Sequence, residues 1–254
     1  MSADLLSPPP HLPPAAALRL SQEAPRVLGN SSSKSLPYPF SLLYAAESPE
    51  TWIRYENLLL ACLRTGDDRS ARLCLERLAE RFGDPNQRVK ALRGLYQEAV
   101  APDNNALEAI LKSYEKEIKD DPANMPIRKR RIALLKSMSK VPDAIAALVE
   151  LLDVSPTDVE AWSELADLYL TQKLYPQAVF SMEEVLLITP NAWNAHARMG
   201  ELLYISAIST TNNDGGTTRI LSESIKRFCR SIELCENYLR GYYGLNLVES
   251  SYWQ

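Results

Sequence analysis

Residues 162–170 read WSELADLYL, and the pattern of this stretch is the strongest structural signal in the chain. Leu165 and Ala166 stand three and four residues after Trp162, and Tyr169 stands four and three residues after them. Such steps place side chains on one face of a helix. Aromatic rings on one helical face are compatible with a ligand box or with one unit of a repeated structure. Recurrence along the chain separates the two interpretations.

The landmarks of this stretch recur with a period of 34 residues. Pro122, Pro156 and Pro190 are separated by that step. The same step relates further pairs of similar residues, namely Ala144 and Ala178, Leu148 and Met182, and Leu151 and Val185. Because the neighbouring units lack a matching set of aromatic residues, we interpret WSELADLYL as the first helix of a repeat and not as a ligand box.

Each repeat is predicted to be a pair of antiparallel helices. In the first helix, the large Trp162 is expected to wedge against the second helix, and the small Ala166 lets the two backbones approach. Ala178 has the same role in the second helix, and Pro190 follows that helix because proline cannot continue the hydrogen-bond ladder. One pair cannot cover its own apolar face, so successive pairs should stack. The sequence therefore predicts an all-α superhelical solenoid.

The composition of the chain changes at about residue 40. Residues 1–40 contain eight of the 17 prolines, and we interpret them as a mostly disordered arm with a few apolar residues that could dock. Residues 41–254 are interpreted as a solenoid of about five to six helical hairpins. Its repeats are expected over about 49–85, 86–122, 125–158, 159–192 and 193–238, with an insertion near 208–219 and a partial repeat over 239–254.

Composition also limits the class of function. The net charge of −4 gives no reason to expect nucleic acid, and the basic residues of RKRR at 128–131 would spread around a helix, so we interpret them as a solvated or partner-facing edge. No apolar run reaches the roughly 20 residues of a membrane span, and we recognise no signal peptide. We therefore expect a cytosolic protein without a membrane helix.

The sequence offers no chemistry-bearing motif. Its four cysteines and two histidines lack metal-ligand spacing, and the cysteines are interpreted as buried apolar residues in a reducing compartment. His196 stands one period after Trp162 and is interpreted as a packed neutral imidazole. Motifs of serine hydrolases, P-loop enzymes and zinc peptidases are absent. We expect neither catalysis nor a cofactor or metal.

Residues 159–192 resemble the tetratricopeptide repeat, with W-x2-L-A-x2-Y, A-x3-M and a closing proline in the expected slots. From about residue 45 onward, the chain is similar to the family of cytosolic tetratricopeptide subunits (subunit 2) of the endoplasmic reticulum membrane protein complex. The features beyond a generic repeat are IRKRRIA, DVEAWSELADLYL, YPQAVFSMEEVLLITP and SIELCENYLRGYYGL.

This resemblance implies a non-enzymatic scaffold. Such a subunit is peripheral on the cytoplasmic face of the endoplasmic reticulum and belongs to a hetero-oligomer. Its partners are membrane subunits, reached through their cytosolic segments, and other cytosolic subunits. The assembly inserts tail-anchored and multi-pass proteins into the membrane.

The first helices of stacked repeats line a groove that can hold a helix or an extended segment of a partner. The slots that face this groove are expected to hold basic residues first, then acidic ones, then aromatic and apolar ones. The partner-binding residues predicted in this way are Lys129, Lys136, Ser163, Asp167, Leu170, Asn194, Glu201, Tyr204, Arg240 and Tyr243.

The alternative function is a soluble adaptor, such as a co-chaperone that clamps a terminal carboxylate. The clamp slots of that group fall on Lys129, Ala133, Glu164, Asn194 and Arg198, and only two of these five residues fit. Glu164 would repel the bound carboxylate.

The last predicted helix has no second helix after it. Its apolar side chains would be left exposed, so we expect this end to dock on a partner subunit. These side chains are Tyr242, Tyr243, Leu245, Leu247, Tyr252 and Trp253.

Overall fold

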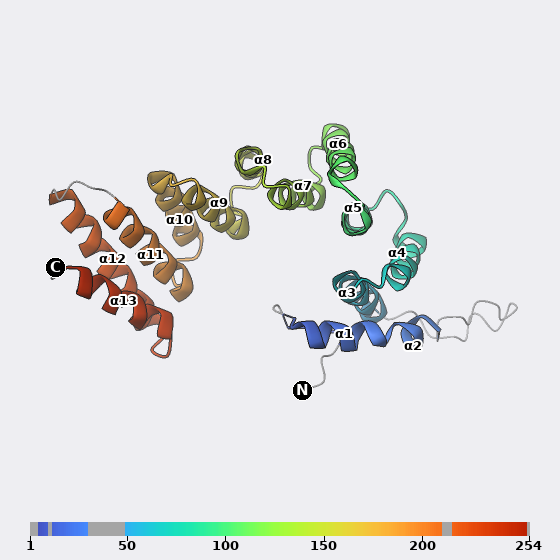
Figure 1. The fold of residues 1–254 in the computed structure, drawn as a ribbon, viewed down its shortest axis with the longest axis horizontal. Coiled ribbons are helices and arrows are strands. Elements are labelled where there is room, and N and C mark those ends of the chain that lie inside the picture. Colours follow the sequence, from blue (N-terminus) through green and yellow to red (C-terminus); the bar gives the residue numbers. More distant parts are fainter. Residues whose placement is uncertain (1–4, 10–11, 30–48, 210–214, 253–254) are drawn as a thin grey trace, which may run out of the picture. The chain divides into compact units, whose positions relative to one another are not determined.

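The structure is a computed structural model that describes residues 5–9, 12–29, 49–209 and 215–252. All regular secondary structure in these ranges is helical, which confirms the predicted all-α class (Figure 1). The chain divides into two compact units, Met1–Leu134 and Leu135–Gln254, which are described separately below.

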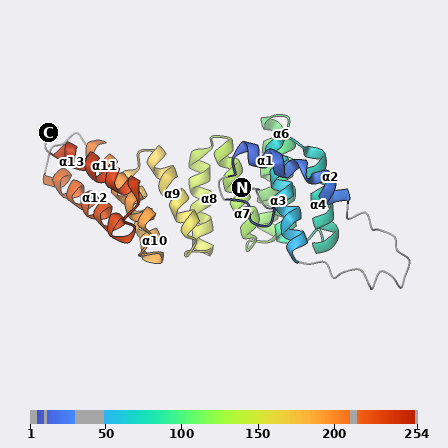
Figure 2. The same cartoon turned by 90° about the horizontal axis from the view of Figure 1, so that it is seen from below.

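The first unit is built from consecutive helices joined by short turns. They are α1 (Pro14–Gln22), α2 (Ala24–Gly29), α3 (Pro49–Thr65), α4 (Asp68–Phe82), α5 (Gln87–Val100), α6 (Asn104–Asp120) and most of α7 (Met125–Ser137). Helix α3 packs against α4 on one side and α1 on the other (Figures 1 and 2).

The second unit begins in the last turn of α7. Its helices are α8 (Val141–Val154), α9 (Val159–Thr171), α10 (Tyr175–Ile188), α11 (Trp193–Ser209), α12 (Gly215–Leu234) and α13 (Leu239–Tyr252). Helices α9 and α10 pack as one pair and α11 and α12 as the next, and α13 packs on both members of that last pair.

Polar residues in the short segments between helices act as N-caps for the helices that follow them. Side-chain oxygens of Asp67, Asn86, Asp103, Asn124 and Asp158 accept hydrogen bonds from backbone N–H groups in the first turns of α4, α5, α6, α7 and α9. These bonds satisfy donors that have no partner within a helix, so each break fixes the start of the next helix.

Three of the turns between paired helices contain a residue in the left-handed backbone conformation. Gly66 adopts a φ of 75°, Ser139 of 58° and Lys173 of 59°, and each immediately precedes the N-cap residue of the second helix. Ser139 and Lys173 are one 34-residue period apart, so the turn repeats together with the helices. Only the first of these turns has the glycine that such a conformation favours.

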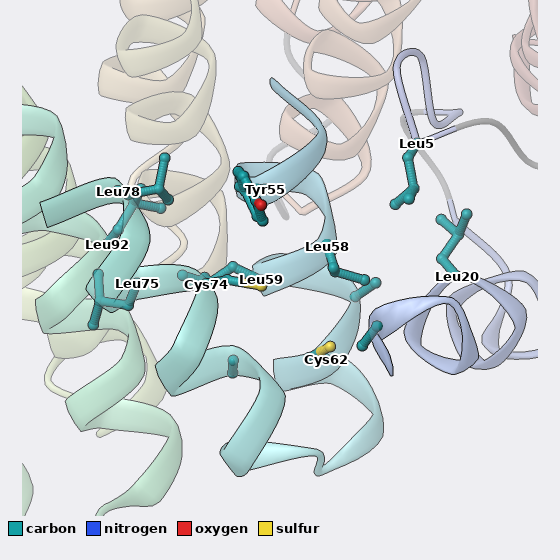
Figure 3. Packing of buried hydrophobic residues seen from close by; sticks show 13 residues of the cluster. Leu5, Leu20, Tyr55, Leu58, Leu59, Cys62, Cys74, Leu75, Leu78 and Leu92 are labelled. Carbon is teal, nitrogen blue, oxygen red and sulfur yellow. The ribbon is translucent and has the colours of Figure 1, made fainter. Parts of the chain in front are cut away.

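The predicted disordered arm is wrong for residues 14–29, which form α1 and α2. Leu20 and Ala24 are buried in the core of the first unit beside Leu58 and Cys62 of α3, and Leu5 joins the same cluster (Figure 3). The prolines of this segment do not prevent a helix, because Pro14 stands at the first position of α1, where its missing N–H costs nothing. Residues 1–4, 10–11 and 30–40 of the arm lie outside the described ranges.

The core of the second unit repeats with the helix pairs. The same three slots of the second helix are buried in each pair: Ala144, Leu148 and Leu151; Ala178, Met182 and Val185; Ser224, Phe228 and Ser231. The second set follows the first by 34 residues, and the third follows the second by 46 because of the insertion. In the first helix of the central pair, Leu165 and Ala166 are buried as well.

A hydrogen bond to a proline carbonyl accompanies this period. The Nε1–H of Trp162 donates to the Pro156 carbonyl at 2.8 Å, and Nε2 of His196, one period later, lies 3.0 Å from the Pro190 carbonyl. Trp162 also meets Phe180 of α10 edge to face, with ring centroids 6.1 Å apart, but it is only half-buried. The side chain in this slot therefore connects the preceding loop to the first helix, and in Trp162 it also contacts the second helix.

The insertion near 208–219 is helical at both ends. Helix α11 runs to Ser209 and α12 starts at Gly215, while residues 210–214 lie outside the described ranges. Farther along α12, Phe228 fills the space between α11 and α13. A Cβ at Gly244 would lie 2.2 Å from its ring, so only glycine fits there.

Candidate partner-binding groove

Ion pairs join the first helices of successive repeats. In the first unit, Arg88 of α5 pairs with Glu56 of α3 and Arg130 of α7 pairs with Glu98 of α5. In the second unit, the pairs are Lys136 with Glu164, Arg198 with Asp167 and Arg240 with Glu201. We call these five contacts the ion-pair ladder. They link helices that do not follow one another directly, so they bear on the angle between repeats.

The pair of Arg130 and Glu98 is the most enclosed step of this ladder. The Glu98 side chain is 11% exposed and that of Arg130 is 25% exposed. The Tyr114 hydroxyl donates a hydrogen bond to the same carboxylate at 2.5 Å. Burial, followed by this hydrogen bond, raises the pKa of Tyr114, so the phenol stays protonated. Gly94 provides the room, because a Cβ there would meet the tyrosine hydroxyl at 2.1 Å.

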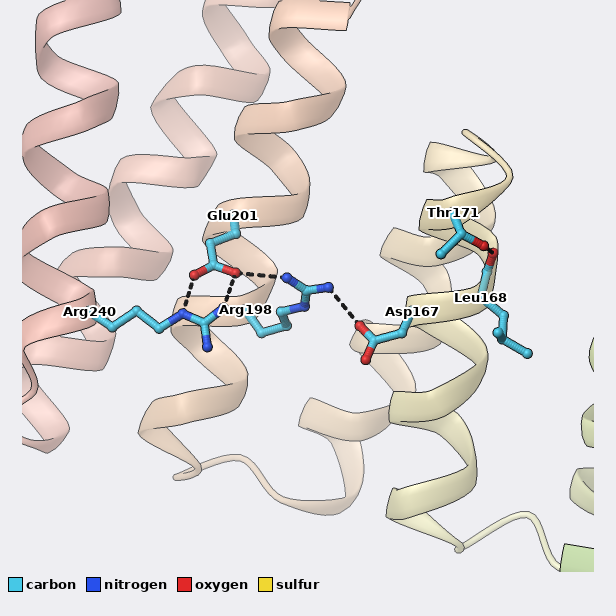
Figure 4. A network of polar contacts seen from close by, with 6 residues as sticks. All are labelled: Asp167, Leu168, Thr171, Arg198, Glu201 and Arg240. Atoms are coloured by element: carbon cyan, nitrogen blue, oxygen red, sulfur yellow. Dashed lines mark hydrogen bonds and ion pairs between the residues drawn. The ribbon is translucent and has the colours of Figure 1, made fainter. Parts of the chain in front are cut away.

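Two steps of the ladder merge into one network in the second unit (Figure 4). The Arg198 guanidinium donates to Asp167 at 2.7 Å and to Glu201 at 2.9 Å. Glu201 in turn accepts two bonds from Arg240, one of them 2.8 Å long from Nη2. The four side chains come from α9, α11 and α13 and carry two positive and two negative charges.

The two arginines of the network keep their positive charges at any physiological pH. The hydrogen bond with Glu201 raises the pKa of Arg240. For Arg198, burial alone would lower the pKa, but hydrogen bonds with Glu201 and Asp167 outweigh it and raise the pKa. A partner that binds here therefore meets a fixed, internally neutral pattern of charge.

The network borders a groove of about 640 Å³ in the second unit. Its polar wall contains Ser163, Asp167, Asn194, Arg198 and Arg240. Its apolar side contains Met182, Val185 and Tyr238. A groove that combines hydrogen-bonding groups with an apolar side suits a peptide segment, whose backbone and side chains need both.

The structure gathers some of the predicted groove residues and separates others. Ser163, Asp167, Asn194 and Arg240 line the groove together, and Glu201 adjoins it through its two arginine partners. Leu170 and Tyr204 instead pack partly buried against apolar clusters.

The remaining predicted residues lie outside the groove lining. Lys136 is engaged with Glu164, and Tyr243 is 71% exposed on α13. Lys129 is an exposed residue of the first unit. The predicted exposure of the last helix applies to Tyr242, Tyr243 and Leu247, whereas Leu245 packs partly buried. Trp253 and the Tyr252 side chain are not among the described atoms.

Arg198 is a central groove residue that is absent from the predicted partner-binding set. In the sequence it appears only as a slot of the carboxylate clamp. Its spacing of three residues from Glu201 is a typical helical ion-pair spacing and could have indicated the contact. The contact with Asp167, 31 residues earlier, depends on how two repeats pack and has no local signal.

None of the helices in the described ranges combines the length and the apolar character that a bilayer span requires. Within the same ranges, no group of three or more His, Cys, Asp or Glu side chains could hold a metal ion.

Comparison with known proteins finds a family and several relatives that are similar to this chain. Residues 92–212 match the family described as the EMC2 TPR-like repeat domain. The TPR repeat protein oca3 of Schizosaccharomyces pombe is 35% identical over 78% of this chain. ER membrane protein complex subunit 2-B of Xenopus laevis is 34% identical over 77% of it. The chain spans 66% and 61% of the lengths of these two relatives.

A solved structure agrees on the fold. The crystal structure of a tetratricopeptide repeat protein from Parabacteroides merdae matches with a TM-score of 0.52 and 18% sequence identity. The match covers 78% of this chain and 72% of that protein's chain. Together with the relatives above, this confirms the tetratricopeptide resemblance. The chain belongs to the tetratricopeptide family that carries the EMC2 TPR-like repeat domain.

Proposed function

We propose that this protein is a non-enzymatic scaffold subunit of the endoplasmic reticulum membrane protein complex, bound to the cytoplasmic face of the membrane. The observation that carries the proposal is the 34% identity, over 77% of the chain, to a relative named as subunit 2 of that complex. As a scaffold, it would hold membrane subunits and other cytosolic subunits together during insertion of tail-anchored and multi-pass proteins.

The groove of Ser163, Asn194 and Arg240 is the surface we propose for a partner's cytosolic segment. Because the ladder neutralises its own charges, a partner would be recognised by shape and hydrogen bonds more than by net charge. Lys129, Lys136 and Tyr243 remain proposed contacts outside this groove.

The alternative function, a co-chaperone that clamps a terminal carboxylate, has less support. Of its clamp slots, Glu164 is engaged with Lys136, and Arg198 already donates to Asp167 and Glu201. A carboxylate would have to displace those partners and approach an acidic residue, which costs free energy.

The test is co-purification from detergent-solubilised membranes of cells depleted of their own subunit 2. An epitope-tagged full chain should recover the other subunits of the complex in fixed ratio, as quantified by mass spectrometry. Recovery of a heat-shock protein without those subunits would support the adaptor instead and overturn the scaffold.

A groove variant and a matched control sharpen this test. Asn194→Trp places a large side chain in the groove, whereas Leu187→Trp adds the same ring on α10 outside it. We expect only the first to reduce recovery of a subunit, with the helical circular dichroism signal unchanged. Equal recovery by both variants would remove the groove from the interface.

A further inference from the structure

A second apolar groove lies on a different part of the second unit. It has a volume of about 480 Å³ and runs between α8 and α10, with α9 at its base. Val149 of α8 and Phe180 of α10 border it and are 41% and 54% exposed. Trp162 and Tyr169 contribute from α9. We call this surface the α8–α10 groove.

The α8–α10 groove is held in shape from below. Leu165 and Ser181, which are buried, form part of its lining. The Trp162 ring is fixed by its hydrogen bond to the Pro156 carbonyl and by its edge-to-face contact with Phe180. An apolar side chain that enters the groove beside these rings would meet a preformed surface and order few groups, which favours binding.

This groove uses another face of α9 than the groove near the ladder. Its α9 residues are Trp162, Leu165 and Tyr169, whereas the first groove uses Ser163 and Asp167. At about 100° per residue, the two sets lie roughly 150° apart around the helix. One surface can therefore be occupied without blocking the other.

The two helices that border the groove carry charge of a single sign. Helix α8 contains Asp143, Glu150 and Asp153, and α10 contains Glu183 and Glu184. Neither helix contains a lysine or an arginine. Asp153 follows Val149 by one helical turn, and Glu184 follows Phe180 by one turn, so a carboxylate accompanies each apolar border residue.

We propose that the α8–α10 groove docks a basic amphipathic segment of a partner protein. One apolar side chain of that segment packs in the groove against Trp162 and Phe180, and its lysine or arginine residues face Asp153 and Glu184. Complementary charge across such a surface selects basic segments and repels acidic ones. This inference does not depend on the proposed function, because it concerns a separate surface and any partner with this chemistry.

The test uses two synthetic peptides whose leucines are spaced for one helical face. One peptide carries lysine and the other glutamate at every remaining position. With fluorescein-labelled peptides and the full chain, fluorescence anisotropy should detect binding of the lysine peptide, weakened by added salt, and no binding of the glutamate peptide.

Variants assign that binding to the groove. Phe180→Ala and the double variant Asp153→Asn with Glu184→Gln should each weaken the lysine peptide at least tenfold. Leu187→Ala is the matched control, because Leu187 is an exposed apolar residue of the same helix outside the groove. It should leave binding unchanged.

Several outcomes would overturn the proposal. They are no binding of the lysine peptide, equal binding of the glutamate peptide, and equal affinity of Phe180→Ala and the unchanged chain. Self-association of the chain that is lost only in Phe180→Ala would identify a second copy as the occupant instead. Circular dichroism of each variant excludes unfolding as the cause of lost binding.

Discussion

At the residue scale, single side chains carry roles that their type alone does not reveal. Trp162 follows the repeat pattern of a core wedge, yet it is half-buried and its indole N–H holds the carbonyl of the preceding proline. His196 occupies the same slot one period later, is buried, and approaches the next proline carbonyl. The period thus predicted the slot, while the chemistry of each occupant determined how the slot is used.

The left-handed residue before α10 gives a first prediction. Lys173 has a φ of 59°, a conformation that costs an L-residue free energy but costs glycine little. Lys173→Gly should therefore raise the free energy of unfolding by up to about 1 kcal/mol, the gain being reduced by the larger entropy of the unfolded chain. Urea unfolding measures the change.

The neighbouring residue provides the control for that prediction. Gln172 has a φ of −89°, so Gln172→Gly gains nothing from the freedom of glycine and should lower stability. If both substitutions shifted the urea midpoint in the same direction, the left-handed turn would not be a source of strain.

The buried thiols of the first unit give a second prediction. Burial raises the pKa of Cys62 and of Cys74 to about 12 from the ordinary 9.0. Because the thiolate is the reactive form, iodoacetamide at mildly alkaline pH should label the partly exposed Cys229 and Cys235 before either buried thiol, as followed by peptide mass spectrometry.

The same thiols bear on alkaline stability. Between pH 9.0 and about 12, the unfolded chain releases thiol protons that the folded chain retains, so the free energy of unfolding should fall as pH rises through that window. Replacing Cys62 with alanine should flatten this part of the pH profile. Rapid labelling of Cys62 and Cys74 in the folded protein would contradict their enclosure.

At the element scale, the helices depend on contacts both within and between pairs. Polar breaks in the sequence cap the helices, and small residues such as Ala178 permit the close approach within a pair. The ion-pair ladder adds contacts between first helices of successive repeats, for example from Arg240 of α13 to Glu201 of α11. Local sequence predicted the caps and the small residues, but the ladder required knowledge of which helices meet.

Two steps of the ladder should differ in their effect on stability. Arg130→Met leaves the Glu98 carboxylate enclosed without its cation and should lower the free energy of unfolding by about 2–3 kcal/mol. Arg88→Met removes a cation that is 62% exposed and should cost less than about 1 kcal/mol. Urea unfolding of both variants measures the difference. A similar cost for both would mean that enclosure does not set the strength of the ladder.

At the scale of the whole molecule, the sequence predicted the fold class, the family and the 34-residue organisation. It did not predict α1 and α2. Prolines indicate disorder only where they interrupt a helical pattern, whereas Pro14 stands at the first position of a helix. It predicted only part of the groove, because slot numbering ignores how neighbours pack: Leu170 and Tyr204 turned out to join apolar clusters. Contacts between repeats were therefore the least predictable feature.

We propose that this protein is a platform whose repeats hold other subunits. Cryo-electron microscopy of the assembly isolated through the tagged full chain tests this role most directly. We predict density of another subunit in the groove of Ser163, Asn194 and Arg240, on the cytoplasmic side of a membrane-embedded complex. Isolation of the chain without membrane subunits, or an assembly in which this groove holds only solvent, would contradict the proposed role of the groove in the scaffold.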